Sequence, residues 1–275
     1  MRAQVSLTPP ESKKLIAKAV TSMDVVQKAK KDGIILLGAS TTCAFILEEL
    51  LNRKVTHGYG CGIIIPRGTC IMKEMLDSIR QRGYAKIWVM DKGTLHEDLA
   101  IDDVLKRMGA GDVFIKGANA IDPQGNPGIF LGSPIGGTAA KVVGIAMARG
   151  INMIIAVGLE KMIPTPIAKA AAEAGIQRMD YSMGMPVGLL PLHGTAVDEV
   201  KAIQILTGAE AIPIGAGGVS GAEGSVVLVI KGSDSQVEKT LEMVRSVKGT
   251  GEPPTEPPEC RDCKYPRCSL GAEAT

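Results

Sequence analysis

The fold is decided by the stretch IILLGASTT at residues 34–42. Its first four residues are apolar and mostly β-branched or leucine, which is typical of a short strand buried on both faces of a sheet. Residues 38–42 then form a turn rich in glycine and hydroxyl side chains, and the amphipathic stretch 43–51 predicts a helix. A buried strand that leads through such a turn into a helix is typical of an α/β fold.

The same alternation continues toward the C-terminus. Strands are predicted at 62–65, 86–90, 112–116 and 153–157, with helices at 70–82, 97–108, 138–149 and 165–174. This order predicts a doubly wound, mostly parallel sheet. Ligands bind such sheets at the carboxyl ends of the strands, which here carry residues 38–42, 66–69, 116–122 and 158–161. Toward the N-terminus, the capping box Thr8-Pro-Pro-Glu11 predicts a helix that runs, with a break, to about Lys31 and forms a polar outer layer.

The pattern changes after Gly184. A possible strand at 186–190, a helix at 196–206, strands at 210–214 and 225–230 and a helix at 234–247 suggest a small ferredoxin-like α+β unit. The run GTGEPPTEPP at 249–258 indicates a stiff, exposed linker that carries a cysteine-rich tail away from the core. We therefore predict an α/β ligand-binding domain at 1–183, a small α+β domain at 184–248, and a Pro-rich linker with a Cys tail at 249–275.

Composition excludes several classes of function. The 31 Lys+Arg and 29 Asp+Glu residues leave a net charge of +2, and only 3% of residues are aromatic, so the chain lacks the basic field and stacking side chains of nucleic-acid binders. The N-terminus has no apolar signal region, and no apolar run approaches the roughly 18 residues of a membrane span. Six cysteines in 275 residues do not resemble a secreted disulfide framework. We expect a cytoplasmic protein with neither a nucleic-acid nor a membrane partner.

The turn at 38–42 is a candidate anion site. Backbone N–H groups and the helix dipole attract negative charge at the start of a helix. Gly38, which has no side chain, lets an anion come close to the backbone, and Ser40, Thr41 and Thr42 offer hydroxyl donors. Simple N-capping of the helix by Ser40 or Thr41 explains the same residues equally well.

Polar side chains also follow the strand predicted at 112–116. Lys116, Asn119 and Asp122 would project into the strand-end crevice and could orient a substrate there. The alternative is a turn stabilised by the Asn and Asp side chains. Farther along, a glycine-rich helix start lets the backbone come close to a phosphate or carboxylate. It contains Gly136, Gly137, Thr138 and Lys141.

These stretches resemble, in the same order, the superfamily of ribose-5-phosphate isomerases, CoA transferases and lactate-utilisation (LUD) proteins. Residues 34–50 are similar to the isomerase's first strand, phosphate loop and helix, Pro66-Arg-Gly-Thr69 to its second phosphate-side turn, 116–122 to its Asp-rich motif, and 135–141 to its glycine-rich helix start. Residues 156–165, AVGLEKMIPT, look more like LUD proteins. The resemblance implies a NagB/RpiA/CoA transferase-like fold over residues 33–165 and adds Thr69 to the ligand-binding residues.

The chain departs from the isomerase pattern where that enzyme keeps its catalytic groups. Lys116 and Asn119 stand at two positions where the isomerase has aspartates, and Lys141-Val142 stands where it has Arg and the glutamate base. Because this motif offers no general base, we do not expect pentose-phosphate isomerase activity. A transferase nucleophile is not recognisable either, since the glutamates considered, Glu160 at a strand end and Glu223 beside a glycine, do not stand in a recognisable setting. The catalytic residues, and whether the protein is an enzyme, remain open.

The tail carries the motif Cys260-x2-Cys263-x4-Cys268. Three thiols this close together, among Arg and Lys residues that favour thiolates, can bind zinc or an iron–sulfur cluster. A fourth ligand is missing, and it could come from Cys61, Cys70, His193, a neighbouring subunit or an exogenous molecule. The alternative is an unstructured tail with incidental thiols.

Two functions therefore stand side by side. The leading hypothesis is a strand-end crevice that binds an anionic metabolite, of the sugar phosphate or acyl/CoA type, through the two glycine-rich turns. The rival hypothesis is a metal- or iron–sulfur-carrying accessory protein whose tail docks on a redox partner. The ligand, the metal and a homo-oligomeric state are left open by the sequence.

Overall fold

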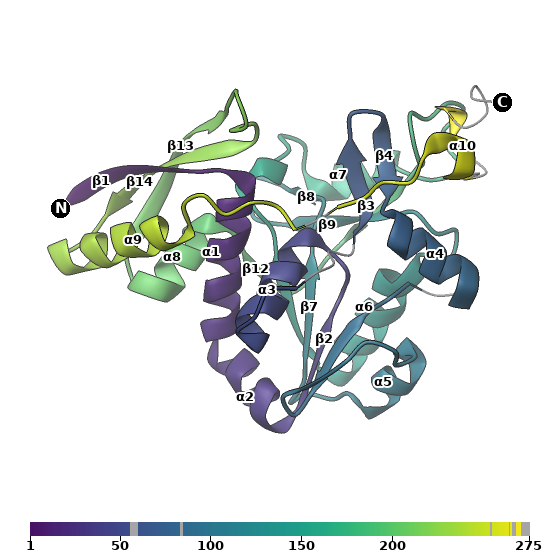
Figure 1. Ribbon diagram of the computed structural model, residues 1–275, viewed down its shortest axis with the longest axis horizontal. Helices are drawn as coiled ribbons and strands as arrows, with labels where there is room; N and C mark the ends of the chain where they lie inside the picture. Colours follow the sequence, from purple (N-terminus) through teal and green to yellow (C-terminus); the bar gives the residue numbers. More distant parts are fainter. Residues whose placement is uncertain (56–59, 83–84, 254, 264, 266–267, 271–275) are drawn as a thin grey trace.

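β2 (Ile34–Leu37) lies inside a six-stranded sheet, as its apolar sequence predicts. In the computed structural model, which describes residues 1–55, 60–82, 85–253, 255–263, 265 and 268–270, the strand order is β12-β10-β7-β2-β5-β6. The other five strands are β12 (Thr195–Val197), β10 (Asn152–Ala156), β7 (Val113–Gly117), β5 (Trp88–Asp91) and β6 (Thr94–His96). The first four strands of this order run parallel, so their carboxyl ends meet at one edge of the sheet (Figure 1).

The sheet is mixed rather than mostly parallel. β5 runs antiparallel to β2, and β6 runs antiparallel to β5. Lys92 and Gly93 join β5 and β6 with φ angles of 47° and 81°, the double positive φ that suits a two-residue hairpin turn. The chain therefore doubles back after β5 to form β6. Helix α5 (Ile101–Arg107) begins only after this hairpin, so it is shorter than the helix predicted at 97–108.

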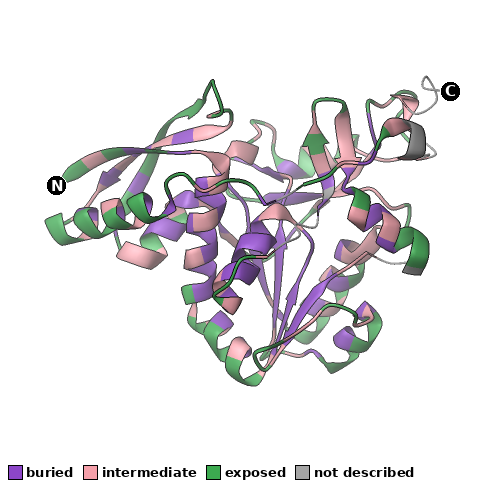
Figure 2. Ribbon diagram, in the orientation of Figure 1, coloured by how far each residue is buried: buried purple, intermediate pink, exposed green. Residues whose placement is uncertain are grey.

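Helices cover both faces of the sheet. Ile35 and Leu37 of β2 face a core shared with α1 (Pro9–Ser22), α3 (Thr41–Leu51) and α8 (Glu199–Thr207). Ile34 and Leu36 face a second core, shared with α5 and α6 (Gly137–Arg149). Figure 2 shows the buried strands between these helical layers. This alternation of buried side chains is the reason that β2 reads as a continuous apolar run.

The expectation that the first helix forms a polar outer layer is wrong. Leu15, Ile16 and Val20 are at most 1% exposed, and α1 packs against α3 and α8. These apolar residues lie on one face of the helix, which needs a partner surface. The predicted capping box is confirmed, since Glu11 accepts a hydrogen bond from the Thr8 backbone at 2.9 Å, and the break falls before α2 (Asp24–Asp32).

A second, three-stranded sheet has the order β1-β14-β13. The hairpin of β13 (Glu210–Gly217) and β14 (Ser225–Lys231) and the helix α9 (Asp234–Val247) agree with the predicted elements. The third strand, however, is β1 (Arg2–Leu7), whose buried Val5 and Leu7 alternate with exposed polar residues. The segment expected there forms β11 (Gly188–Pro191) and pairs with β9 (Pro127–Leu131) instead.

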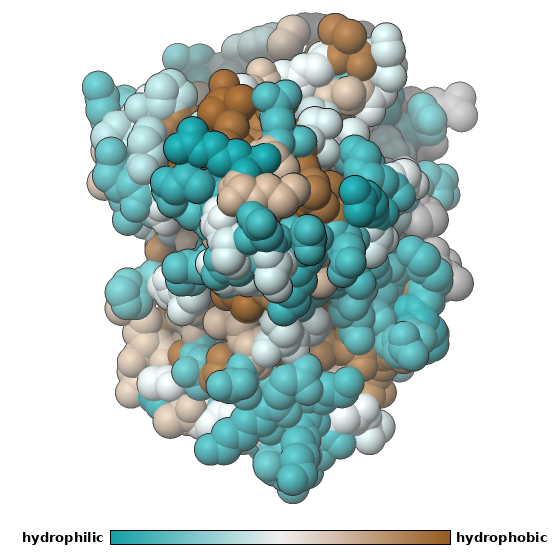
Figure 3. Space-filling model, turned by 90° about the vertical axis from the view of Figure 1, so that its left-hand side faces the viewer, coloured by the Kyte–Doolittle hydropathy of each residue, from teal (hydrophilic) through white to brown (hydrophobic). Residues whose placement is uncertain are grey.

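Each sheet thus takes a strand from a distant part of the chain. β12 lies beyond residue 184 but belongs to the six-stranded sheet, while β1 comes from the N-terminus and completes the small sheet. Hydrophilic residues predominate on the side of the molecule that carries the small sheet, and hydrophobic ones there form separate small groups (Figure 3). Among the described residues, no helix has the length and apolar character needed to cross a membrane.

Short hairpins lie outside the main sheet. β3 (Cys61–Ile65) agrees with the predicted strand, but it pairs with β4 (Gly68–Ile71). The helix predicted from residue 70 therefore begins later, as α4 (Lys73–Arg82). Because β3 belongs to this hairpin, residues 66–69 do not lie at a carboxyl end of the main sheet. The remaining short elements are β8 (Ala120–Ile121), the 3-10 helix η1 (Leu159–Lys161), α7 (Ile167–Glu173) and α10 (Cys260–Cys263).

Residues 249–253 and 255–263, which we call the C-terminal strap, return across the molecule instead of extending from it (Figure 1). Glu252 forms an ion pair with Lys13 of α1, and the Glu256 carbonyl accepts a hydrogen bond from the Lys73 backbone at 2.8 Å. Pro253 and Pro258 are buried. The predicted exposure of the linker is confirmed in part, since Gly251, Glu252 and Glu256 are exposed. The expectation that the linker carries the tail away from the core is wrong, because prolines also pack well where an extended segment crosses an apolar surface.

Glu252→Gln is expected to lower the free energy of unfolding by about 1 to 2 kcal/mol. The substitution leaves the Lys13 side chain, which is 9% exposed, without its counter-charge, and the cost is moderated because Glu252 itself is 39% exposed. Glu256→Gln is the matched control in the same strap, since its partner Lys73 is 56% exposed, and it should change stability by less than about 0.5 kcal/mol. Urea unfolding at pH 7 measures both, and equal effects would contradict this account.

Candidate functional site

The carboxyl ends of β2, β7 and β10 bring three polar segments together. Each strand ends in, or is soon followed by, a glycine: Gly38, Gly117 and Gly158. A side chain at Gly38 would overlap Lys116, one at Gly117 would lie 2.7 Å from the Ser40 hydroxyl, and one at Gly158 would overlap the Glu160 carboxylate. The glycines thus give space to polar side chains exactly where parallel strands end, which is where ligands bind such sheets.

Lys116, the last but one residue of β7, is buried at this edge. It is 7% exposed, and its Nζ donates a hydrogen bond to the Ala39 carbonyl at 2.5 Å. The ammonium therefore lies over the turn that follows β2. The sequence placed Lys116 at a strand end, and the structure agrees with that position.

The turn after β2 starts α3. Ser40 accepts a hydrogen bond from the Cys43 backbone at 3.0 Å, so the N-capping alternative describes this residue in the structure. Thr42 differs, because its hydroxyl oxygen is buried and has no hydrogen-bond partner among the described residues. A buried hydroxyl without a partner can donate to a ligand. The ligand-binding roles of Gly38, Ser40, Thr41 and Thr42 stay predictions.

Glu160 and Lys161 follow β10 in the 3-10 helix η1. Both carboxylate oxygens of Glu160 are buried and lack a hydrogen-bond partner within the described part of the chain. Lys161 Nζ lies 3.8 Å from Glu160 Oε1 and forms an ion pair with it. Burial lowers the pKa of Lys161, with Lys13 and Lys116 adding to the decrease while Glu160 and Glu252 oppose it. These effects mean that the ammonium groups of Lys13 and Lys116 both lie near that of Lys161.

Glu199 completes the arrangement from the end of β12, at the start of α8. It is fully buried, and one of its oxygens accepts a hydrogen bond from the Leu159 backbone at 2.9 Å. Burial raises the pKa of Glu199 from 4.5 to about 7, and the nearby Glu160 carboxylate contributes to the increase. We call Lys13, Lys116, Glu160, Lys161 and Glu199 the strand-end cluster.

The sequence analysis missed two members of this cluster. Lys13 comes from α1, which was predicted to be an outer layer. The signal in the sequence was helical spacing, because Lys13 precedes Ile16 and Val20 of the buried face by three and seven residues. Glu199 follows the three-residue strand β12, which is too short to read from an apolar pattern. Glu160 was noted only as a glutamate at a strand end, and Glu223, noted with it, is exposed on the β13–β14 loop.

Other predicted site residues have structural partners elsewhere. Asn119 bridges two strands, since its Nδ2 donates to the Gly62 carbonyl at 2.6 Å and its Oδ1 accepts from the Phe130 backbone at 3.0 Å. Asp122 is buried and accepts hydrogen bonds from Gln124, Asn126 and Ile167. For Asp122 the alternative of a stabilised turn describes what the structure contains, whereas Asn119 ties β3 to β9.

The second glycine-rich helix start is also apart from the strand-end cluster. Gly136 and Gly137 begin α6 with positive φ angles of 74° and 57°, and Lys141, one turn on, forms an ion pair with Asp102 of α5 at 2.5 Å. Thr138 is partly buried. α3 packs in the first core and α6 in the second, so the two predicted anion turns begin helices on opposite faces of the main sheet.

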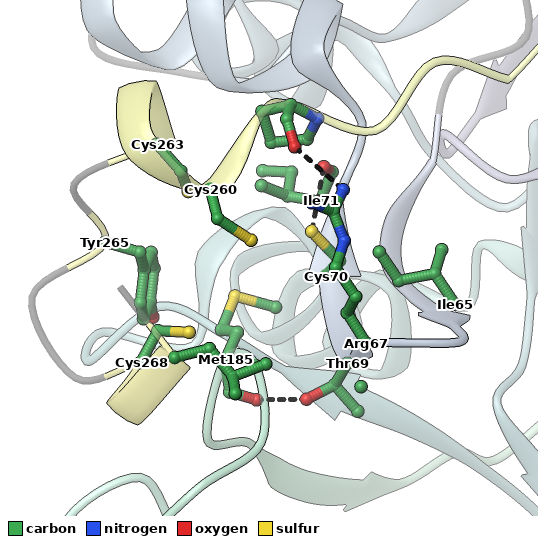
Figure 4. Close-up of a pocket in the computed structure, with 14 residues that line it drawn as sticks. Ile65, Arg67, Thr69, Cys70, Ile71, Met185, Cys260, Cys263, Tyr265 and Cys268 are labelled. Atoms are coloured by element: carbon green, nitrogen blue, oxygen red, sulfur yellow. Dashed lines mark hydrogen bonds between the residues drawn. The ribbon is translucent and has the colours of Figure 1, made fainter. Parts of the chain in front are cut away.

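A second candidate site, which we call the thiol pocket, lies beside β4 (Figure 4). Thr69 belongs to this pocket, where its hydroxyl donates to the Met185 carbonyl at 2.5 Å. Four cysteines line the pocket together with apolar side chains: Cys70, Cys260, Cys263 and Cys268. Within the described residues, no three His, Cys, Asp or Glu side chains are grouped closely enough to hold a metal ion.

The other proposed fourth ligands are not seen at this pocket. His193 lines a separate groove with Met23 and Gly150. The side chain of Cys61 lies outside the described residues, as do those of Arg261, Lys264 and Arg267. Burial raises the pKa of Cys70, and Cys263 and Cys260 contribute to the increase, so the strand cysteine and the tail cysteines influence one another.

Comparison with known proteins adds little to this picture. No family model matches the chain, and no curated protein matches it. Among solved structures, a ribose-5-phosphate isomerase in complex with phospho-erythronic acid aligns over 84% of each chain with 15% sequence identity and a TM-score of 0.30. A likeness this weak does not establish a shared fold.

Proposed function

We propose that the strand-end cluster binds a small anionic metabolite, carrying a phosphate or carboxylate group, and that Glu160 exchanges a proton with it. The observation that carries this proposal is the Glu160 carboxylate, which is buried beside Lys161 with neither oxygen hydrogen-bonded by a described residue. A buried carboxylate without a partner is costly unless a ligand or a reaction uses it.

Charge supports an anionic ligand. Three lysines near one edge of the sheet, Lys13, Lys116 and Lys161, supply positive charge, and burial strengthens their attraction for a ligand anion. Glu252 and Glu160, which pair with Lys13 and Lys161, offset part of this charge. Burial is the main reason that the pKa of Lys161 is lowered, and Lys13 and Lys116 lower it further, so a bound anion would favour the charged form of Lys161. The unpartnered hydroxyl of Thr42 supplies a donor from the start of α3.

Acid–base chemistry is supported by the second carboxyl group. Glu199 has a pKa of about 7, so it is partly protonated at neutral pH, and it lies near Glu160. Two carboxyl groups in different environments can divide the roles of proton donor and acceptor between them. The ligand class is the one suggested by the sequence, a sugar phosphate or an acyl/CoA-type metabolite.

The rival function, a metal-carrying protein that acts with a redox partner through its tail, has less support as the main activity. The tail cysteines lie against the body of the protein, where they line the thiol pocket, instead of at the end of an exposed tether. The strand-end cluster, by contrast, gathers unpartnered polar atoms where α/β sheets bind ligands.

Inorganic phosphate is the probe for this proposal. At ten times its dissociation constant, phosphate should stabilise the protein by about 1.4 kcal/mol, or about 3 °C in melting temperature, relative to chloride at equal ionic strength. Lys161→Ala should abolish the shift, whereas Glu160→Gln should keep or increase it, because it removes a negative charge from the site.

Lys141→Ala is the matched control for this experiment. It removes a lysine from the other predicted anion turn, where Lys141 is paired with Asp102 on the surface, and it should retain the full phosphate shift. An unchanged shift in Lys161→Ala, or a shift lost in Lys141→Ala, would contradict the strand-end site.

A further inference from the structure

The thiol pocket brings together cysteines from two distant parts of the sequence. Cys70 lies on β4, and Cys260, Cys263 and Cys268 lie in and after α10. Figure 4 shows the sulfur atoms of Cys70, Cys260 and Cys268 turned toward the interior of the pocket, with Cys263 one turn away from Cys260 on α10. Of the cysteines described, Cys43 is the one buried in the main core instead.

Several contacts hold the tail over β4. The Pro258 carbonyl accepts a hydrogen bond from Arg67 at 3.4 Å, and the Cys263 carbonyl accepts one from Arg80. On the other side of the pocket, the Tyr265 hydroxyl donates to the Gly132 carbonyl at 2.6 Å, and the Ser269 backbone donates to the Ser182 carbonyl at 3.1 Å. The tail is thus anchored on both sides of Cys260 and Cys268.

We propose that Cys70, Cys260, Cys263 and Cys268 form a four-thiolate metal centre, in which Cys70 is the ligand that the tail lacks. Four thiolates suit a zinc ion or an iron–sulfur cluster, which share this ligand chemistry. The proposal is independent of the anion site, because none of the four cysteines belongs to the strand-end cluster.

The surroundings of the four thiols favour a metal over separate thiolates. Ile65, Ile71 and Met185 line the pocket, so thiolates there would be poorly solvated and would repel one another. A bound cation removes both costs. Because each ligating thiol gives up its proton, binding should release up to four protons, and Arg67 at the pocket adds positive charge that balances the thiolates.

Binding has to draw the sulfur atoms closer together than they are in the structure, where no group of three potential ligands among the described residues meets the spacing of a metal site. β4 is paired along its length with β3, whereas separate hydrogen bonds to side chains and loops hold the tail, so we expect the tail to move rather than β4. A metal in this pocket would consequently fix the C-terminal strap to the hairpin.

The test uses the intact protein and zinc alone. The protein is treated with EDTA, incubated with or without zinc under reducing conditions, and then alkylated, and mass spectrometry measures the labelling of each cysteine. We expect zinc to protect Cys70 together with Cys260, Cys263 and Cys268 by at least tenfold. Cys43 is an internal control, since it is fully buried and should stay unlabelled in both samples.

Variants and metal analysis complete the experiment. Cys70→Ser should reduce the bound zinc or iron of protein purified without oxygen at least tenfold, as Cys268→Ser should, whereas Cys43→Ala should retain it. Visible absorbance with about four irons per chain identifies a cluster, and about one zinc per chain without colour identifies a zinc ion. Three results would each overturn the proposal: labelling of Cys70 that zinc does not change, a disulfide joining Cys70 to the tail in the protein as purified, or no metal bound in any sample.

Discussion

Asp122→Ala is expected to lower the free energy of unfolding by about 3 to 5 kcal/mol. The Asp122 carboxylate is 1% exposed and accepts hydrogen bonds from the backbones of Gln124, Asn126 and Ile167 at 2.9 to 3.0 Å. Alanine leaves these backbone donors without a partner, and the bond from Ile167 is fully buried. Because Ile167 begins α7, the substitution also detaches that helix from the turn after β8.

The protonation of Asp122 sets the pH of this measurement. Burial alone would raise its pKa, but the hydrogen bonds from Ile167, Asn126 and Gln124 hold the pKa below the ordinary 3.8. A carboxyl group with a lowered pKa stabilises the fold above its unfolded-state pKa and loses this contribution only as the pH falls through the folded-state value. Urea unfolding at pH 7 therefore measures the full effect.

Asp103→Ala is the control for Asp122→Ala. Asp103 is exposed on α5 and pairs with Lys106 at 2.8 Å in full contact with solvent, so its loss should leave the free energy of unfolding close to that of the wild type. A change of less than 1 kcal/mol for Asp122→Ala would contradict the structural role assigned to this carboxylate and would favour the ligand-binding role that the sequence suggested.

Glu199→Gln is expected to make the protein less sensitive to pH between 5 and 8. Folding raises the pKa of Glu199 from 4.5 to about 7, so the folded state binds more protons than the unfolded state in this window. Stability therefore falls as the pH rises from below 4.5 to above 7, by about 3 kcal/mol in total and by about 2.5 kcal/mol between pH 5 and pH 8. Glutamine cannot ionise, so this part of the pH dependence should disappear.

The measurement compares the wild type with Glu199→Gln by urea unfolding at pH 5, 6, 7 and 8. As the pH increases, the free energy of unfolding of the variant should rise relative to that of the wild type. This holds whichever of the two proteins is more stable at pH 5. Glu160 is the neighbouring carboxylate that adds to the raised pKa, so Glu160→Gln should move the transition to lower pH without removing it. Parallel pH profiles for the wild type and Glu199→Gln would show that Glu199 ionises as it does in the unfolded chain.

Local sequence patterns determined most individual elements. The apolar run at 34–37, the capping box at Thr8 and the strand–helix order from 210 to 247 all correspond to elements of the structure. Apolar periodicity and helix caps depend on residues a few positions apart, so they can be read along the chain. The patterns also placed Lys116 and Glu160 correctly at the ends of β7 and β10.

Long-range packing decided how these elements combine. The N-terminal strand β1 rather than a strand near 188 completes the small sheet, and β5 turns back at Lys92 and Gly93 to make the main sheet mixed. Choosing between such pairings depends on the burial of whole faces against distant segments, which a local pattern does not encode. The packing of α1 against α3 and α8 was missed for the same reason, because those partners are distant in the sequence, and α1 was expected to be an outer layer.

The two candidate sites show the same division. The sequence determined which strand-end turns and which tail cysteines could carry chemistry. Only the tertiary structure brought Lys13 of α1 to Lys161 and Glu199, at the end of β12, to Glu160. Only the tertiary structure placed Cys70 beside the tail. Side chains that meet across a folded protein are selected by the docking of helices, strands and the C-terminal strap, because burial of apolar surface fixes that docking regardless of the distance between the residues in the sequence.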